Sequence, residues 1–141
     1  MLHHLHRADL LSRRVADQHL GERIGIGRAM FLVLDMLDSA RPGGITQQAI
    51  ADHLGLTKAA VSRHIATARA QGWLRAIPSD TSRRENSVTL TAAGRALVKR
   101  GRQQRAESER QVIEALGTRA LQRTTRTLEQ LGSLLEERLR G

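Results

Sequence analysis

The stretch Ile45–Gln71, which reads ITQQAIADHLGLTKAAVSRHIATARAQ, decides the fold of this chain. Thr46 and Thr57 stand where helices would begin, and a threonine hydroxyl at an N-cap accepts from backbone N–H groups that have no partner in the first turn. Gly55 lies between them, where a left-handed backbone would penalise a side chain. The pattern therefore predicts two short helices joined by a tight turn, with Gly72 ending the second.

The two helices are expected over residues 47–53 and 58–71. Apolar residues recur on faces that can meet across the turn, and Ala51 is small where the helices must approach closely. A small residue, a glycine and then a valine at these spacings are typical of a helix-turn-helix. The residues expected to form its core are Ile50, Ala51, Leu54, Leu56, Val61, Ile65 and Ala68.

The second helix has another face that is short, polar and basic. At 100° per residue its members share one stripe, which suits a helix that lies in a major groove about 12 Å wide. The alternative is the solvated face of an ordinary helical hairpin. The stripe consists of Lys58, Ala59, Ser62, Arg63, Ala66 and Arg69.

Composition favours duplex DNA as the partner. The 141 residues include 23 Lys and Arg against 14 Asp and Glu, a formal net charge of +9, which favours nucleic acid before membrane. The absence of cysteine argues against a disulfide framework, a zinc finger and a thiol sensor. Phe31 and Trp73 are the only aromatic residues, whereas single-strand and RNA binders stack bases on several.

Other classes of protein have little support in the sequence. No apolar run approaches the roughly 20 residues that span a bilayer, and the N-terminus lacks the apolar core of a signal peptide. We therefore expect a soluble, cytoplasmic protein without a membrane partner. No nucleophile motif, metal triad or phosphate loop is present, so we expect neither an enzyme nor a cofactor.

The flanks of the helix-turn-helix predict further elements. Apolar residues recur at helical spacing over residues 2–20 until glycines interrupt the pattern from Gly21 onward, and residues 28–40 are apolar nearly all round, which predicts burial. Two short strands are expected over residues 73–77 and 86–90. A two-stranded hairpin directly after a helix-turn-helix is a wing, and its turn carries Arg83 and Arg84.

Two helices are expected to complete the chain. Thr91 should cap a long one, whose polar middle, residues 99–110, suggests a helix that joins two compact bodies with solvent between them. Thr118 should cap the last helix. Its apolar stripe, near heptad spacing, is Leu121, Thr125, Leu128, Leu131, Leu135 and Leu139.

The order of these parts resembles the MarR family of bacterial transcription regulators. The resemblance is carried by ITQQAIADHLGLTKAAVSRHIATARAQGWL and by SRRENSVTLTAAGRALV, within Ile45–Val98. It implies a mainly α fold with a small β-wing (α+β), a winged helix-turn-helix with dimerisation helices at both ends. Ser82 stands where the family usually has an Asp that pairs with the arginine two positions on, here Arg84. Serine supplies no charge, so the wing is expected to be less firmly held unless Asp80 or Glu85 substitutes.

The resemblance also implies how the chain is divided and assembled. We assign residues 1–27 to an N-terminal dimerisation helix and connection, 28–95 to a DNA-binding lobe and 96–141 to C-terminal dimerisation helices. A two-fold dimer places its recognition helices on successive major grooves about 34 Å apart, on an inverted-repeat operator. The alternative is that the terminal stripe packs only within its own chain. The expected dimer contacts are Leu5, Leu11, Leu121, Leu128, Leu131 and Leu135.

DNA contacts are expected in three classes. Arg63 is the strongest candidate for a base edge because arginine reads guanine bidentately, with a phosphate contact as its alternative. Lys58 and Ser62 are the other base-edge candidates, and Ala59 could touch a thymine methyl. Contacts with phosphates are expected at Thr46, at Gln47 or Gln48, and at Thr57 and Arg69. Contacts with the minor groove are expected at Arg83 and Arg84.

The resemblance implies a repressor released by a small anionic or aromatic effector. Three alternatives remain: a low-specificity architectural DNA-binding protein, a metal-sensing regulator that uses His3, His4 and His6, and a winged helix that contacts only proteins. The histidine cluster lies at a terminus that tends to fray, so no metal site is expected. His64 is interpreted as a core histidine.

Overall fold

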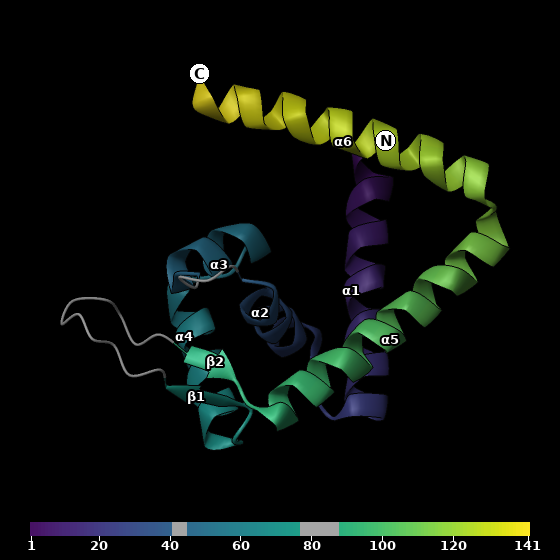
Figure 1. Cartoon of the computed structure of the whole chain (residues 1–141). Coiled ribbons are helices and arrows are strands. Elements are labelled where there is room, and N and C mark those ends of the chain that lie inside the picture. Colours follow the sequence, from purple (N-terminus) through teal and green to yellow (C-terminus); the bar gives the residue numbers. More distant parts are fainter. Residues whose placement is uncertain (41–44, 77–87) are drawn as a thin grey trace. The chain divides into compact units, whose positions relative to one another are not determined.

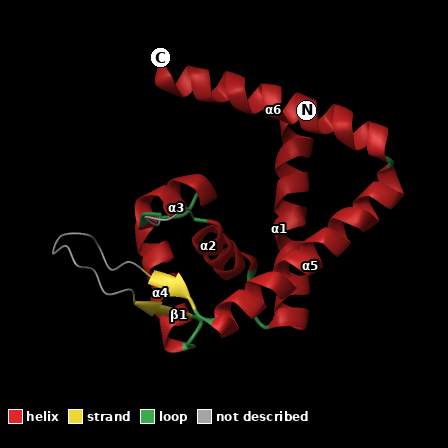
Figure 2. Ribbon diagram, viewed as in Figure 1, coloured by secondary structure: helices red, strands yellow, loops and turns green. Residues whose placement is uncertain are grey.

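The computed structural model describes residues 1–40, 45–76 and 88–141. Its elements, shown in Figure 1, are α1 (Leu2–Ile24), α2 (Arg28–Ser39), α3 (Gln47–Leu54), α4 (Lys58–Ala70), β1 (Leu74–Ala76), β2 (Val88–Leu90), α5 (Ala92–Leu116) and α6 (Thr118–Arg140). Helices dominate, and β1 pairs with β2 in one antiparallel sheet (Figure 2). The prediction of a mainly α fold with a small β-wing after a helix-turn-helix is confirmed.

Backbone contacts divide the chain into two units, Met1–Gln104 and Arg105–Gly141. The boundary lies in the polar middle of α5, which passes through it as one continuous helix. The first unit therefore contains the helix-turn-helix, the two strands and the first half of α5. The second contains the end of α5 and all of α6.

The core of the first unit is built around α2, which contacts α1, α3, α4 and β2. Phe31 is 2% exposed and Leu34 is fully buried, as the apolar run predicted. Ile50 from α3 and Val61 from α4 are also fully buried. Burying an apolar side chain of this size stabilises a fold by about 1.5–3 kcal/mol, so these contacts hold both helices of the helix-turn-helix on α2.

The prediction that glycines interrupt the first helix from Gly21 onward is wrong, because α1 continues to Ile24. A helical glycine costs only about 1 kcal/mol relative to alanine, and burial of the neighbouring Leu20 favours continuation. Helix α1 ends at Gly25, whose φ is 81°. The carboxylate of Asp17 then accepts from the amide of Arg28 at 2.6 Å, so α1 caps the start of α2.

Two further boundaries differ from the predictions. The first strand begins at Leu74, because the amide of Trp73 donates instead to the carbonyl of Ala68 at 2.9 Å and closes the end of α4. The N-cap of α6 is Gly117, with φ 82°, and Thr118 is already its first helical residue. The strands pair in the register Leu74–Leu90, Arg75–Thr89 and Ala76–Val88, and residues 77, 86 and 87 lie outside the described residues.

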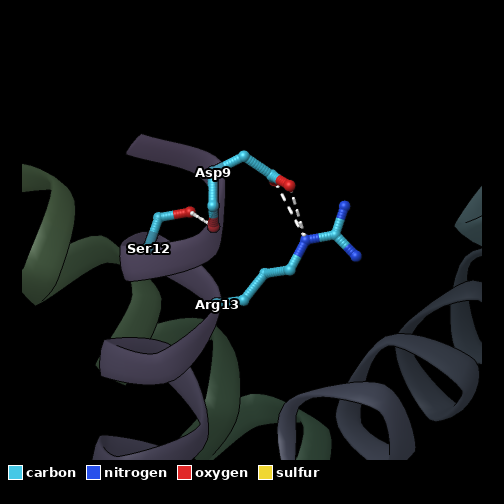
Figure 3. Close-up of polar contacts among 3 residues, drawn as sticks. All are labelled: Asp9, Ser12 and Arg13. Atoms are coloured by element: carbon cyan, nitrogen blue, oxygen red, sulfur yellow. Dashed lines mark hydrogen bonds and ion pairs between the residues drawn. The ribbon is translucent and has the colours of Figure 1, made fainter. Parts of the chain in front are cut away.

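An exposed ion pair lies on α1 (Figure 3). The Nε of Arg13 donates to both carboxylate oxygens of Asp9, at 3.0 and 2.9 Å, and the hydroxyl of Ser12 donates to the carbonyl of Asp9. The hydrogen bond from Arg13 lowers the pKa of Asp9 below its ordinary value. The contact spans one helical turn and thus supports α1 without joining it to another element.

Candidate nucleic-acid interface

Two threonines fix the starts of the helix-turn-helix. The hydroxyl of Thr46 accepts from the amide of Ala49, and that of Thr57 accepts from the amide of Ala60, each at 3.1 Å. Gly55 closes the turn between α3 and α4 with φ 63°. Both predicted caps are confirmed. The threonines are exposed, so the N-terminal ends of α3 and α4 remain open to anions such as phosphate.

Helix α4 has one buried and one exposed face. Val61, Ile65 and Ala68 are buried in the core of the first unit. Within the part of the chain that the structure describes, the guanidinium groups of Arg63 and Arg69 form no hydrogen bond or ion pair. The predicted polar stripe is therefore free of the core, and every member is exposed: Lys58, Ala59, Ser62, Arg63, Ala66 and Arg69.

The accompanying face of α3 is less basic. Gln47 is half-buried at the start of the helix. The amide of Gln48 donates to the carboxylate of Asp52 at 2.8 Å, one turn further on. In α3, therefore, the exposed Thr46 end offers more to a phosphate than the middle of the helix does.

The histidine interpretation needs one correction. His64 is half-buried rather than part of the core, since it lies at the edge of the buried face of α4. At the other end of the first unit, the rings of His3 and His4 contact edge to face at 5.6 Å. Across residues 1–40, 45–76 and 88–141, no three His, Asp or Glu side chains are grouped to hold a metal ion.

The base of the wing is held by Thr91. Its hydroxyl donates to the carbonyl of Gly72 at 2.7 Å and accepts from the amide of Gly94 at 3.1 Å, which confirms the predicted cap. Its own amide donates to the carbonyl of Trp73 at 2.9 Å. One residue thus ties the end of α4 to the start of α5, at the point where β2 ends.

Arg95 and Arg75 were missed in the sequence. A guanidinium nitrogen of Arg95 donates to the carbonyl of Leu90 at 2.8 Å and steadies the end of β2. Arg75 is exposed on β1, beside the buried Leu74, and adds a positive charge next to the wing. The alternation of a strand could have indicated it, because the residue after a buried one faces the opposite side. Arg83, Arg84 and Ser82 lie outside the described residues.

The helix-turn-helix carries the family resemblance. Residues 24–85 match the model of the MarR family, a range that includes α2, α3, α4 and β1. Over these residues the chain is similar to the MarR family of winged helix-turn-helix transcription regulators. The predicted resemblance is confirmed.

Solved structures of MarR family regulators share the fold over nearly the whole chain. MepR of S. aureus, in a complex with DNA, is 23% identical with a TM-score of 0.81, covering 96% of this chain and 98% of that one. A MarR/EmrR family regulator from Acinetobacter sp. ADP1 is 22% identical with a TM-score of 0.79, covering 96% of each chain.

A third structure contains a small molecule. A MarR family protein of Mycobacterium tuberculosis, in complex with salicylic acid, is 27% identical with a TM-score of 0.73, covering 90% of this chain and 92% of that one. Among curated proteins, none matches this sequence. No helix in the described part of the chain is long and apolar enough to cross a membrane.

Proposed function

We propose that this protein is a MarR family regulator that reads a specific sequence of duplex DNA and represses transcription as a homodimer on an inverted-repeat operator. The observation that carries the proposal is the division of α4 into two faces. One face is locked into the core by Val61, Ile65 and Ala68, and the other is an exposed basic stripe. A helix held in this way presents a fixed pattern of side chains to a major groove.

Each class of DNA contact then has candidates. Arg63 reads a guanine edge, with Lys58 and Ser62 beside it and Ala59 against a thymine methyl. Phosphates lie at the capped helix starts and at the flanks of the two helices, where Thr46, Gln47, Thr57 and Arg69 are found. Arg83 and Arg84 of the wing enter the minor groove, and we add Arg75 as a backbone contact.

Homodimer formation is supported by the second unit. Between residues 105 and 141 no residue is buried, and the apolar stripe of α6 includes Leu128 at 43% and Leu135 at 50% exposure. Segments below about 40 residues seldom fold without oligomerisation or a cross-link. A second copy of the chain supplies the missing surface, at half-buried Leu121 and Leu131 as well as at Leu128 and Leu135.

The same interface extends to the N-terminal helix in our proposal. Leu5 is 37% and Leu11 is 46% exposed on α1, and both are large apolar side chains for which the described chain offers no full cover. We assign residues 1–27 and 96–141 to dimerisation and residues 28–95 to DNA binding.

Regulation by a small anionic or aromatic effector is supported by the salicylic acid complex of the M. tuberculosis relative. Such a ligand acts only through different affinities for the DNA-competent state and the incompetent state. The cytoplasm, where the operator DNA of a bacterium lies, is the proposed location.

Selection of bound DNA from a random pool by the full-length protein, at moderate salt, tests the proposal. A motif with two-fold symmetry and half-sites about one helical turn apart is the expected result. A single unrepeated motif would contradict the homodimer on an inverted repeat. A pool without enrichment would overturn sequence-specific reading and favour an architectural protein.

A further inference from the structure

One turn of α5 fastens this helix to α2. The Nε of Arg102 lies 2.6 Å from Oδ1 of Asp35, and its Nη1 lies 2.8 Å from Oδ2 of Asp38. Its Nη2 donates to the hydroxyl of Ser39 at 3.0 Å. All three guanidinium nitrogens therefore contact the last turns of α2. The planar fork of arginine makes such a contact directional, which a lysine could not reproduce.

The two residues before Arg102 fix the same turn from other sides. A Cβ on Gly101 would lie 2.3 Å from Cε2 of Phe31, so α5 approaches the core of α2 as only a glycine allows. A guanidinium nitrogen of Arg100 donates to the carbonyl of Arg23 at 2.7 Å, near the end of α1. Residues 100–102 thus contact two helices at once.

The charges in this contact depend on one another. Asp35 and Asp38 are one turn apart on α2, where two carboxylates repel unless a cation lies between them. Burial lowers the pKa of the Arg102 guanidinium, but the hydrogen bond and charge of Asp35, and then those of Asp38, outweigh it and raise that pKa. The side chains are 41%, 16% and 21% exposed for Arg102, Asp35 and Asp38, so the carboxylates are largely removed from water.

Helix α5 is fixed to the first unit at two separate points. The first is its start, where Thr91 and Gly94 lie against the end of α4. The second is the turn at Gly101, about 10 Å further along the helix at 1.5 Å per residue. Two fixed points determine the direction of a helix. Beyond them α5 continues without a break to Leu116, in the second unit.

We propose that the contact of Arg102 with Asp35 and Asp38 is a positioning device that restricts the half-site spacings on which the dimer can bind. It does so by fixing the direction in which α5 leaves the first unit, which contains the helix-turn-helix. The inference rests on the proposed reading of an inverted repeat by a homodimer, and it adds the residues that set the spacing.

The geometry of DNA makes spacing a sensitive measure of this direction. Each added base pair moves a half-site by about 3.4 Å and rotates it by about 35°. A dimer in which the direction of each α5 helix is fixed binds best at one half-site spacing and loses affinity at other spacings. A dimer with a loosened α5 tolerates neighbouring spacings, although each recognition helix still reads its half-site.

The experiment measures Kd for a series of operators that differ only in half-site spacing, one base pair at a time, and for a DNA with a single half-site. Full-length parent protein is compared with Arg102→Gln, which removes the charge, and Arg102→Lys, which keeps it without the fork. Ser39→Ala is a milder change to the same contact. Arg110→Gln is the matched control, because Arg110 pairs with Glu107 and Glu114 of its own helix.

In the parent and in Arg110→Gln, affinity should fall steeply on either side of one spacing. In Arg102→Gln the ratio of Kd at a neighbouring spacing to Kd at the best spacing should be about 3- to 30-fold smaller than in the parent. This is the range of coupling effects for residues outside both sites. Arg102→Lys should restore part of the discrimination, and Ser39→Ala should show a smaller loss. Single-half-site affinity should stay within about twofold of the parent in all four variants, since none of the changed residues touches DNA in our proposal.

Two outcomes would overturn the inference in distinguishable ways. A parent with a clear optimum and an Arg102→Gln variant with the same profile would refute the positioning role alone, as would an equal loss on single and double half-sites. A parent without any spacing preference would refute the proposed dimeric reading and this inference with it. If Arg102→Gln does not fold, the profile of Ser39→Ala decides, and a profile like that of the parent refutes the role.

Discussion

Gly94 lies directly against Trp73, because a Cβ built on Gly94 would come within 2.2 Å of the carbonyl oxygen of Trp73. The same carbonyl accepts from the amide of Thr91 at 2.9 Å. The end of α4, the end of β2 and the start of α5 therefore meet within a space that leaves no room for a side chain. This explains why the sequence Leu90-Thr91-Ala92-Ala93-Gly94 has glycine at its end.

Gly94→Ala should destabilise the protein by about 1–3 kcal/mol, because the new methyl group must displace backbone atoms. The gain of about 0.5–1 kcal/mol from a better helix former offsets only part of this cost. Urea denaturation followed by circular dichroism measures the change. Gly21→Ala is the control, since a Cβ there meets nothing within 4 Å in α1 and should leave stability unchanged or higher. Equal stability of Gly94→Ala and the parent would contradict the packing.

Val61→Asp and Ser62→Asp should separate folding from DNA binding at adjacent positions of α4. Val61 is fully buried, and an unpaired carboxylate there costs more than the marginal stability of a domain, so this variant should unfold. Ser62 is exposed, so its variant should keep the circular dichroism of the parent. It should nevertheless bind DNA more than about tenfold more weakly, because a carboxylate would face phosphates. A folded Val61→Asp variant would show that the faces of α4 are wrongly assigned.

Arg63→Ala should weaken binding to the selected operator by about 1–3 kcal/mol and relax the preference at one base pair. Arg69→Ala, a proposed phosphate contact, should weaken binding to all sequences alike and reduce the salt slope by about one. Fluorescence anisotropy at several salt concentrations, on the operator and on single-base variants, distinguishes the two. Arg63→Ala with unchanged sequence preference but a lower salt slope would identify Arg63 as a phosphate contact instead.

The Asp9–Arg13 pair should give α1 a specific pH dependence. The hydrogen bond from Arg13 lowers the pKa of Asp9. The stabilisation of α1 by this ion pair is therefore fully present above the ordinary pKa of 3.8 and is lost as pH falls through the lowered pKa. Arg13→Gln should return the Asp9 pKa toward 3.8. Carboxyl NMR titration of both proteins measures the shift. An Asp9 pKa that does not change in Arg13→Gln would show that the pair does not form in solution.

Most features with a local cause were predictable from the sequence, although the N-cap of α6 is Gly117 and not Thr118. The caps at Thr46, Thr57 and Thr91 and the turn at Gly55 depend on residues within a few positions, and all of them are present. The exposed stripe of α4 follows from helical periodicity alone. These features were sufficient to predict the helix-turn-helix and most of the candidate DNA contacts.

Features that depend on packing were not predictable in the same way. The contact of Arg102 with Asp35 joins residues 67 positions apart, and no pattern in the sequence around either residue predicts it. Whether Gly21 ends α1 depends on what Leu20 packs against, and the partial exposure of His64 depends on the neighbours of α4. Periodicity gives the direction of a side chain around its helix, but the depth of burial is set by the elements that cover it.

The absence of any buried residue between positions 105 and 141 has a consequence beyond assembly. In the proposed dimer, association and the ordering of the last part of the chain become one event, so the midpoint of thermal unfolding rises with protein concentration. Dilution would remove both the partner and the order of this segment. At low cellular concentration most chains would then be monomers that cannot bind an inverted repeat. Occupancy of the operator would therefore depend steeply on the concentration of the protein.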